Sequence, residues 1–285
     1  MVTNIYMQKS FLRETAGVIM RAVVVVVTIV VVIGSISALY EVKGDVGDGA
    51  CNIAVLPLEG TILPFHGIGD FEMIITPESV ESFMDVVEKE KGIEGVLVEV
   101  NSPGGTPVAS ERIAERFRSS DLPIVGLAGD MAASGGYMIA SAADYLIASP
   151  MSEIGSIGVT MSYTEESKKN EEEGITYVQL TSAKYKDMGS PNRPITDEER
   201  ALLEANLLII HNRFVDIVAD YRKMDRSAVE ALADGSAMPG VRALEKGLVD
   251  KLGGRAEARQ TFADLLNKNV DGIKFCEYKR SLLPF

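Results

Sequence analysis

The sequence predicts an α/β fold made of parallel βα units, and three observations support that prediction. Short apolar segments alternate with longer segments whose apolar residues recur at helical spacing. Glycine and proline separate many of these segments, and two apolar segments end in glycine-rich turns that lead into a helix. Strands that alternate with helices are typical of parallel sheets. With 285 residues and 46% hydrophobic content, the chain can bury the core of one large domain or of two smaller ones.

The first βα units are expected between residues 52 and 148. A buried strand is predicted at 52–58, and a loop rich in glycine and proline follows around 63–69. A helix is predicted to begin at Thr76-Pro77-Glu78, with Thr76 as the N-cap, and to end near Lys91. The further elements predicted here are strands at 95–100, 123–128 and 145–148, and helices at 108–118 and 135–143.

A second region is expected to be mainly helical. A polar helix is predicted at 165–173, followed by a strand at 175–180. Thr196-Asp-Glu-Glu199 is a capping box, and it predicts the start of the longest helix, which continues to about Lys223. Shorter helices are predicted at 227–233 and 240–246, with Gly247 as the C-cap of the last.

The N-terminal region contains a segment that can span a bilayer. Residues 22–40 carry no charge, and as a helix they would extend roughly 28 Å, close to the ~30 Å hydrocarbon core. Lys9, Arg13 and Arg21 precede the segment and acidic residues follow it, which places residues 1–21 in the cytoplasm. We therefore expect a single-pass protein of the cell membrane, with an anchor at 22–40, a linker at 41–51 and an extracytoplasmic domain beyond.

Two alternatives to this anchor stay open. A buried core helix is one, although such helices rarely lack a polar stripe over this length. A cleaved signal peptide is the other, because residues 23–33 form a signal-like apolar core and Ser35-Ile-Ser-Ala38 offers small residues for cleavage. We favour a retained anchor.

Charge and cysteine content exclude some classes of function. The net charge is −13 and the chain has no run of Lys and Arg, so binding to nucleic acid is not expected. Cys51 and Cys276 have neither CxxC spacing nor a nearby histidine cluster, so no metal site is expected. An extracytoplasmic location permits a disulfide between them, but two distant cysteines do not establish that they are neighbours.

Two glycine-rich strand ends are candidates for a site. Asn101-Ser-Pro-Gly-Gly105 follows a predicted strand, and its glycines allow a ligand to approach the backbone closely, although such pairs are often simple turns. Met131-Ala-Ala-Ser-Gly-Gly-Tyr137 follows another, and it places Ser134 at a helix start among small residues. Ser134 is therefore a candidate nucleophile, with an ordinary N-cap as the alternative.

A serine nucleophile needs a base, and the chain has only two histidines. His66 lies in the predicted loop, and His211 lies inside the longest helix, where a packed or surface role is expected. Lysine can serve as the base when burial lowers its pKa by about three units, which corresponds to roughly 4 kcal/mol. Lys186, in Lys184-Tyr-Lys-Asp187, is the candidate; Lys184 is equally available, and the alternative for either is a solvated surface charge.

The sequence resembles the signal peptide peptidase A family over roughly residues 50–255. The resemblance rests on an ordered series of motifs, which is more specific than any single one. The motifs are Asn101-Ser-Pro-Gly-Gly105, Met131-Ala-Ala-Ser-Gly-Gly-Tyr137, Ala143-Asp144, Gly155-Ser-Ile-Gly158, Lys184-Tyr-Lys-Asp187, Arg193-Pro-Ile-Thr-Asp-Glu-Glu199, Ala233-Asp-Gly235 and Gly247-Leu-Val-Asp250.

The resemblance implies a role for each matched residue. Ser134 would be the nucleophile and Lys186 the general base, and Ser156 would orient the lysine. The backbone amides of Gly105 and Gly135 would form the oxyanion hole. Met138 stands where family members often have an aromatic residue, which would alter the pocket without affecting the chemistry.

The resemblance also implies an architecture. The family fold is the α/β spiral of Clp protease and crotonase enzymes, here a catalytic domain at 52–255 with a C-terminal helix and tail at 256–285. Members are membrane-anchored and form ring or dome oligomers. Some carry two copies of the domain, with the lysine in the first and the serine in the second. Because this sequence holds one copy, Ser134 of one subunit is expected to meet Lys186 of its neighbour.

The expected function is that of a serine endopeptidase that cleaves remnant signal peptides and other hydrophobic or unfolded segments at the membrane. The expected partners are such peptides, membrane lipid through the anchor and further copies of the chain. No cofactor or metal is called for. A crotonase-like acyl-CoA enzyme is an alternative, because that fold also uses glycine-lined oxyanion holes, and a non-catalytic membrane scaffold is another.

Overall fold

The computed structural model describes residues 20, 24–25, 28, 51–65 and 73–277. The predicted cytoplasmic segment, anchor and linker lie almost wholly outside these residues, as do His66 and the end of the chain from residue 278. Within the described ranges, no helix combines the length and apolar character needed to cross a membrane. Residues from 46 onward form one compact unit of the chain.

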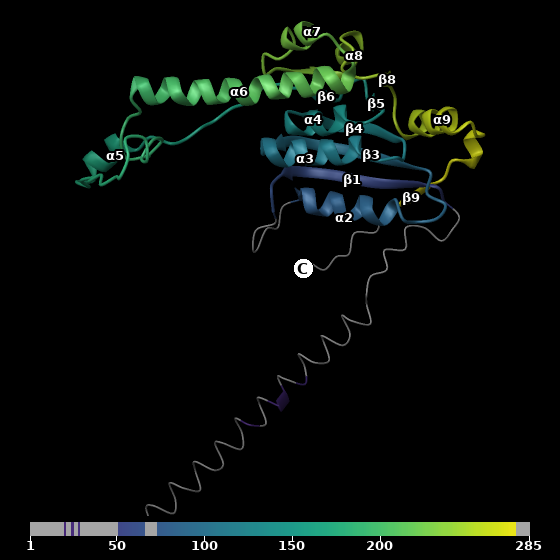
Figure 1. The fold of residues 1–285 in the computed structure, drawn as a ribbon, viewed down its shortest axis with the longest axis horizontal. Helices are drawn as coiled ribbons and strands as arrows, with labels where there is room; N and C mark the ends of the chain where they lie inside the picture. Colours follow the sequence, from purple (N-terminus) through teal and green to yellow (C-terminus); the bar gives the residue numbers. More distant parts are fainter. Residues whose placement is uncertain (1–19, 21–23, 26–27, 29–50, 66–72, 278–285) are drawn as a thin grey trace, which may run out of the picture. The chain divides into compact units, whose positions relative to one another are not determined.

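A mainly parallel sheet forms the centre of the fold (Figure 1). Its main path has the strand order β2-β1-β3-β4-β5-β8, and every neighbouring pair on that path is parallel. These strands are β1 (Ile53–Ile62), β2 (Ile74–Ile75), β3 (Gly95–Gly105), β4 (Ile124–Ala133), β5 (Tyr145–Ala148) and β8 (Lys251–Leu252). The predicted α/β class with parallel strands is therefore confirmed, while the spiral of Clp and crotonase enzymes stays an expectation.

Three short strands extend this sheet at its margins. β9 (Phe275–Glu277) runs parallel to β1, and β6 (Glu153–Gly155) runs parallel to the end of β4. β7 (Ala237–Pro239) pairs with β6 in the antiparallel direction. The β6–β7 pair brings the segment after residue 230 next to the end of β4, where Ser134 lies.

Helices cover both faces of the sheet, and the strands are apolar on both faces for this reason. Successive strand residues point to opposite faces, so Ala54 and Leu56 belong to one buried cluster while Ile53 and Val55 belong to the other. The first cluster includes residues of α2 (Pro77–Val87), α3 (Pro107–Arg118) and α4 (Gly135–Ser141), and the second includes residues of α9 (Arg255–Leu266).

Strands β3 and β4 extend further into the two glycine-rich segments than the sequence predicted. β3 was expected to end near Val100, but its pairing with β1 continues through Gly104 and Gly105 after a register shift. β4 likewise continues to Ala133, where it pairs with Gly155 of β6. The backbone that leads into Ser134 and Gly105 is therefore held by the sheet rather than by a loose turn.

The longest helix, α6 (Asp197–Arg222), has two different halves. Its C-terminal half packs on the sheet unit through Phe214, Val215 and Val218. Arg222 fixes this end, because its guanidinium lies 2.7 Å from the carboxylate of Asp250, which also accepts the amide of Leu146. The predicted capping box at Thr196 and Glu199 is confirmed at the other end.

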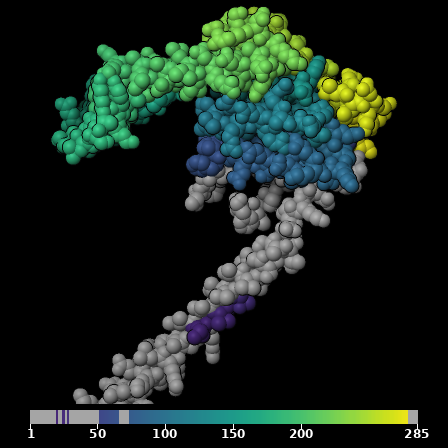
Figure 2. Space-filling model, viewed as in Figure 1, coloured from purple at the N-terminus to yellow at the C-terminus, as the bar shows by residue number. Residues whose placement is uncertain are grey.

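The N-terminal half of α6 belongs to an extension that we call the arm, residues 160–212. The arm also includes α5 (Ser167–Glu172), and Figures 1 and 2 show α5 and the start of α6 beyond the edge of the sheet. We call the remaining described residues from 51 onward the body; they include α7 (Arg226–Glu230) and α8 (Gly240–Glu245), followed by Gly247 at a φ of 78°. In the first half of α6, Glu199 is the buried residue.

The predicted strand at 175–180 is wrong. These residues form no strand, and Val178 and Leu180 are 73% and 92% exposed. Apolar residues at this position mimic a strand in the sequence, but a strand needs a neighbour to pair its amides and carbonyls. The segment lies on the arm, and the described strands all belong to the body.

Cys51 and Cys276 form a disulfide, which settles the pairing that the sequence left open. Their Cα atoms are 5.4 Å apart. Cys276 lies in β9, where it pairs with Ala54 of β1, so the bond joins the two ends of the body at the start of β1.

Candidate active site

Ser134 lies at the junction between β4 and α4, and its backbone is strained. Its φ and ψ angles are 53° and −125°, a region that costs a non-glycine residue about 1–3 kcal/mol. Its amide donates to the carbonyl of Gly155, 2.8 Å away, which ties the junction to β6. The hydroxyl does not cap α4, so the ordinary N-cap role considered for Ser134 is not the one it has here.

The helix that follows is held rigidly. Every residue of α4 is buried, and the hydroxyl of Tyr137 donates to the carbonyl of Leu248 at 2.9 Å. Burial raises the pKa of Tyr137 well above its ordinary value, so it stays a neutral donor. The strain at Ser134 is therefore maintained by packing on both sides of the junction.

The two glycine-rich segments touch each other. Gly104 has a φ of 100°, and a Cβ there would stand 2.9 Å from the Cβ of Ser134. A Cβ on Gly135 would stand 2.2 Å from Ser110 Oγ and 3.3 Å from the amide nitrogen of Gly105. The absence of side chains thus lets the backbone at Gly105 approach the backbone at Gly135 beside the serine.

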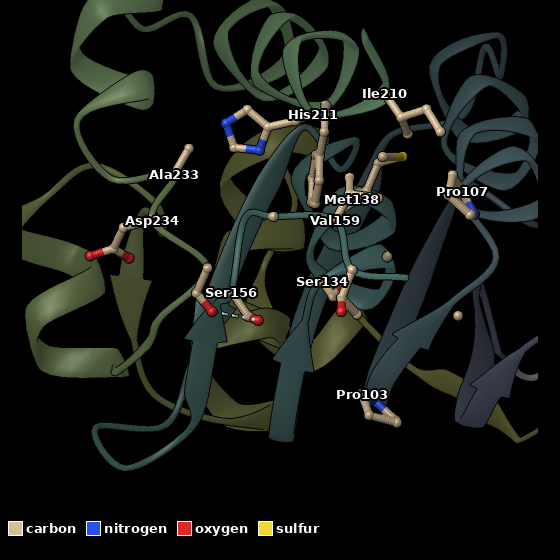
Figure 3. Close-up of a pocket in the computed structure, with 16 residues that line it drawn as sticks. Pro103, Pro107, Ser134, Met138, Ser156, Val159, Ile210, His211, Ala233 and Asp234 are labelled. Carbon is tan, nitrogen blue, oxygen red and sulfur yellow. Dashed lines mark hydrogen bonds between the residues drawn. The ribbon is translucent and has the colours of Figure 1, made fainter. Parts of the chain in front are cut away.

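A pocket of about 550 Å³ brings these residues together (Figure 3). Ser134, Ser156, Gly105 and Gly135 all line it, so four of the five predicted site residues share one cavity. Apolar side chains form much of the remaining wall, which suits an apolar ligand. These are Pro103, Pro107, Met138, Val159, Ile210 and Phe214.

Ser156 follows β6 and lies on the same side of the pocket as Asp234 (Figure 3). It also has a positive φ, 51°, and its amide donates to the carbonyl of Ser236 at 3.0 Å. Its hydroxyl donates to the carbonyl of Gly235, also at 3.0 Å. In this arrangement Ser156 faces the nucleophile's cavity while its hydroxyl is engaged by the body.

Lys186 is not among the residues of this pocket. It is exposed on the arm, in a turn where its amide donates to the carbonyl of Ala183 at 3.2 Å. Lys184 lies in the same turn, with its Nζ 2.6 Å from both carboxylate oxygens of Glu198. The hydrogen bond to Glu198 raises the pKa of Lys184, so that amine is held in its charged form.

Two titratable residues in the pocket were not assigned to it by the sequence analysis. His211 reaches the cavity from α6, and Asp234 lies opposite the apolar wall (Figure 3). Ser236 donates to Asp234 through both its amide and its hydroxyl, which lowers the pKa of that carboxyl. The helical spacing of His211 with Phe214 and Val218, which face the body, was the signal that could have placed His211 here.

Metal binding has no support from the described part of the chain. Among residues 51–65 and 73–277, no group of three or more His, Cys, Asp or Glu side chains is arranged to hold an ion. Both cysteines are consumed by the disulfide.

Comparisons with known proteins connect this geometry to one family. Residues 116–270 match the family model described as "Peptidase family S49". This range contains Ser134, Ser156 and Lys186.

Three relatives are similar to this chain over about 70% of its length. "Putative protease MJ0651" of Methanocaldococcus jannaschii is 35% identical over 199 residues, which is 69% of this chain and 63% of the relative. "Putative signal peptide peptidase SppA" of Enterococcus faecium is 36% identical over 202 residues, 70% of this chain and 58% of the relative. "Putative protease slr0021" of Synechocystis is 34% identical over 201 residues, 70% of this chain and 72% of the relative.

The chain thus spans less than two thirds of the length of the first two relatives and somewhat more of the third. The matched family range begins in α3 and ends after α9, so it includes the arm and the pocket residues from Ser134 onward, whereas Gly105 lies before it. Together these findings confirm the predicted resemblance: the chain belongs to peptidase family S49, among the signal peptide peptidase A proteins.

Proposed function

We propose that the chain is a serine endopeptidase in which Ser134 is the nucleophile. The observation that carries this proposal is the strained junction at Ser134, placed against the amides of Gly105 and Gly135 in one pocket. Such strain persists where the surrounding structure enforces it, and it is common at reacting residues. Membership of a peptidase family supports the same assignment.

The reaction follows from these positions. Ser134 Oγ attacks the carbonyl carbon of a peptide bond and gives up its proton to a base. The negative oxygen that forms is stabilised by the amides of Gly105 and Gly135, at roughly 3–4 kcal/mol for each donor. The protonated base then gives its proton to the leaving nitrogen, the C–N bond breaks and the amine departs, which leaves an acyl group on Ser134 and the base free again. Water, activated by the same base, then releases the acyl group as a carboxylate.

We infer that the base is Lys186 of a neighbouring copy of the chain. The pocket lining contains no lysine among the described residues, and Lys184 is held charged by Glu198. Lys186 lies on the arm, whose exposed apolar side chains include Ile209 and Val178, at 68% and 73% exposure. Burial of such side chains against a second copy favours association, and it would bring the amine into a drier environment. Ser156 would then orient the amine from the side of the body.

The substrates that we propose are remnant signal peptides and other hydrophobic or unfolded segments. The apolar wall formed by Met138, Ile210 and Phe214 supports apolar side chains next to the scissile bond. An anchor at residues 22–40 would hold the enzyme beside such segments at the outer face of the cell membrane. We further propose a ring or dome of copies, because each serine would need a lysine from a neighbour.

A fluorophosphonate probe tests the role of Ser134 without knowledge of the substrate. We expect the full-length membrane protein to be labelled at one serine, and Ser134→Ala to lose the label. Ser110→Ala is the matched control, because its hydroxyl is buried and donates to the carbonyl of Thr106 instead. Labelling that persists in Ser134→Ala, or an unreactive wild-type assembly that also leaves casein uncut, would contradict the proposal and favour a crotonase-like enzyme or a scaffold.

A further inference from the structure

The turn that carries Lys186 lies on the exposed arm. The backbone of this turn is fixed by a side chain that takes no part in the proposed reaction. That group is Arg193, seven residues further along the chain. Its Nη2 donates to the backbone carbonyl of Asp187 at 3.0 Å, and its Nε donates to the Asp187 carboxylate at 3.2 Å. Both acceptors belong to the residue that directly follows Lys186, so one guanidinium determines the path of the chain next to the lysine.

The other side of Arg193 is bound to the start of α6. Its Nη1 and Nη2 lie 2.9 and 2.7 Å from the two carboxylate oxygens of Glu199, a bidentate pair. Glu199 is in turn fixed by the capping box, because the amide of Thr196 donates to its carboxylate at 3.0 Å. Only 6% of the Glu199 side chain is exposed, against 23% for Arg193 and 18% for Asp187. A shielded ion network therefore links the Lys186 turn to the most regular element of the arm.

The pair of Arg193 and Glu199 keeps its charges throughout the pH range of an assay. Hydrogen bonds from Arg193, followed by the one from the amide of Thr196, lower the pKa of Glu199 to about 2. The carboxyl is therefore ionised from about pH 5 upward in the folded and the unfolded chain alike. The same partners raise the pKa of Arg193 above its ordinary value. Any change in a pH–rate profile must then come from another group.

A second ion pair in the same turn provides a contrast. Lys184 and Glu198 also join the turn to α6, but their side chains are 64% and 59% exposed. Exposed pairs of this kind contribute little to structure. By contrast, the hydroxyl of Tyr177 donates to the carboxylate of Asp187 at 2.8 Å, so a third segment of the arm is joined to the Arg193 network.

We propose that Arg193 is a positioning residue for the general base, acting through Asp187 and Glu199 to hold the turn of Lys186 on α6. This inference rests on the proposed role of Lys186. A lysine side chain is long and flexible, so its amine reaches a serine on another subunit only if the backbone at its base is fixed. The planar guanidinium of Arg193, with its bidentate contacts, can fix this backbone, whereas the single ammonium group of a lysine cannot make the same set of contacts.

The test compares Arg193→Gln, Arg193→Lys and Lys184→Gln in the assembled full-length protein. For Arg193→Gln we expect kcat to fall about 10- to 100-fold with KM changed less than about twofold, because a misplaced catalytic group slows the chemical step. The limb of the pH–rate profile that reports the base should move to higher pH, because the amine becomes better hydrated. Arg193→Lys should restore less than half of the lost activity. Lys184→Gln should stay within about twofold of wild type in both constants.

Several results would overturn the inference. An unmoved pH–rate profile in Arg193→Gln, full rescue by Arg193→Lys, or an equal loss in Lys184→Gln would each show that Arg193 supports the fold only. If Arg193→Gln does not assemble, Asp187→Asn carries the same test, since it keeps the size of the side chain and removes the acceptor charge. Wild-type activity in Lys186→Ala would instead contradict the proposed function, so the two failures are distinguishable.

Discussion

The body and the arm hold the two halves of the proposed catalytic machinery in opposite ways. In the body, Ser134 is placed by buried backbone, between the end of β4 and the buried helix α4 and against the glycine segment at Gly104 and Gly105. On the arm, Lys186 occupies an exposed turn that one ion network attaches to α6. The body buries its own apolar core within one chain. On the arm, by contrast, apolar side chains such as Leu180, at 92% exposure, are not buried by any of the described residues.

This difference teaches how the two groups depend on assembly. An oxyanion site made from backbone amides is already organised before substrate arrives. The amine of Lys186 is exposed to solvent on the arm, and removal of water is what favours the uncharged form of a lysine. A single chain therefore presents a prepared nucleophile, and association with a second chain would supply the base.

The largest expected effect is that of removing the amine from the arm. Lys186→Ala should lower kcat about 1000-fold or more, because the serine loses the group that accepts its proton. Lys184→Ala should change kcat only a few-fold, since Lys184 forms an exposed ion pair with Glu198. Steady-state rates on a fluorogenic peptide, measured across pH, check both. An equal loss of kcat in the two variants would contradict the assignment of Lys186, rather than Lys184, as the base.

The next effect concerns the body, where Gly105→Ala should destabilise the fold. A Cβ at Gly105 would stand 1.9 Å from the carbonyl oxygen of Ile62, so β1 and β3 would have to separate locally. We expect a loss of about 3 kcal/mol, the upper range for overpacking. Denaturant unfolding measures it, with Gly272→Ala as the control, because a Cβ there meets no atom within 4 Å. Equal stability of the two variants would mean that the strands yield at Gly105.

The smallest effect on catalysis is expected from the disulfide. Cys51→Ser should cost about 2–4 kcal/mol of stability, because the bond closes a loop with a sequence separation of 225 residues. Its effect on kcat should be less than twofold well below the melting temperature, since Cys51 precedes β1 whereas Ser134 follows the far end of the parallel β4. Thermal melts and rates with and without reductant test this. A large loss of kcat would show that the two ends of the sheet are coupled.

The sequence predicted the body well because its signals are local. Alternating apolar segments and helices predicted the parallel strands, and the capping residue Thr76 marked a helix start that the structure confirms. The motifs around Gly105, Ser134 and Ser156 were identified from neighbouring residues, and the fold brings them into one pocket. The two- and three-residue strands β2, β6 and β8 escaped prediction because such short segments show no periodic pattern in the sequence.

On the arm, both helices and the capping box at Thr196 were predicted, but the segment between the helices was predicted wrongly. Its apolar residues, including Ile175 and Val178, led to a wrongly predicted strand. An apolar pattern in the sequence does not show whether the same chain will bury those side chains. The place of His211 in the pocket also depended on how α6 crosses the body, which its periodicity alone does not determine.

Mixing two inactive variants tests the central claim most directly. Ser134→Ala keeps the lysine and Lys186→Ala keeps the serine, so dissociation and joint reassembly should create some sites with both groups, and activity should return to a measurable fraction of wild type. Each variant reassembled alone is the control. No return of activity, in mixtures shown by differential labels to contain both chains, would contradict a dyad formed between neighbouring subunits.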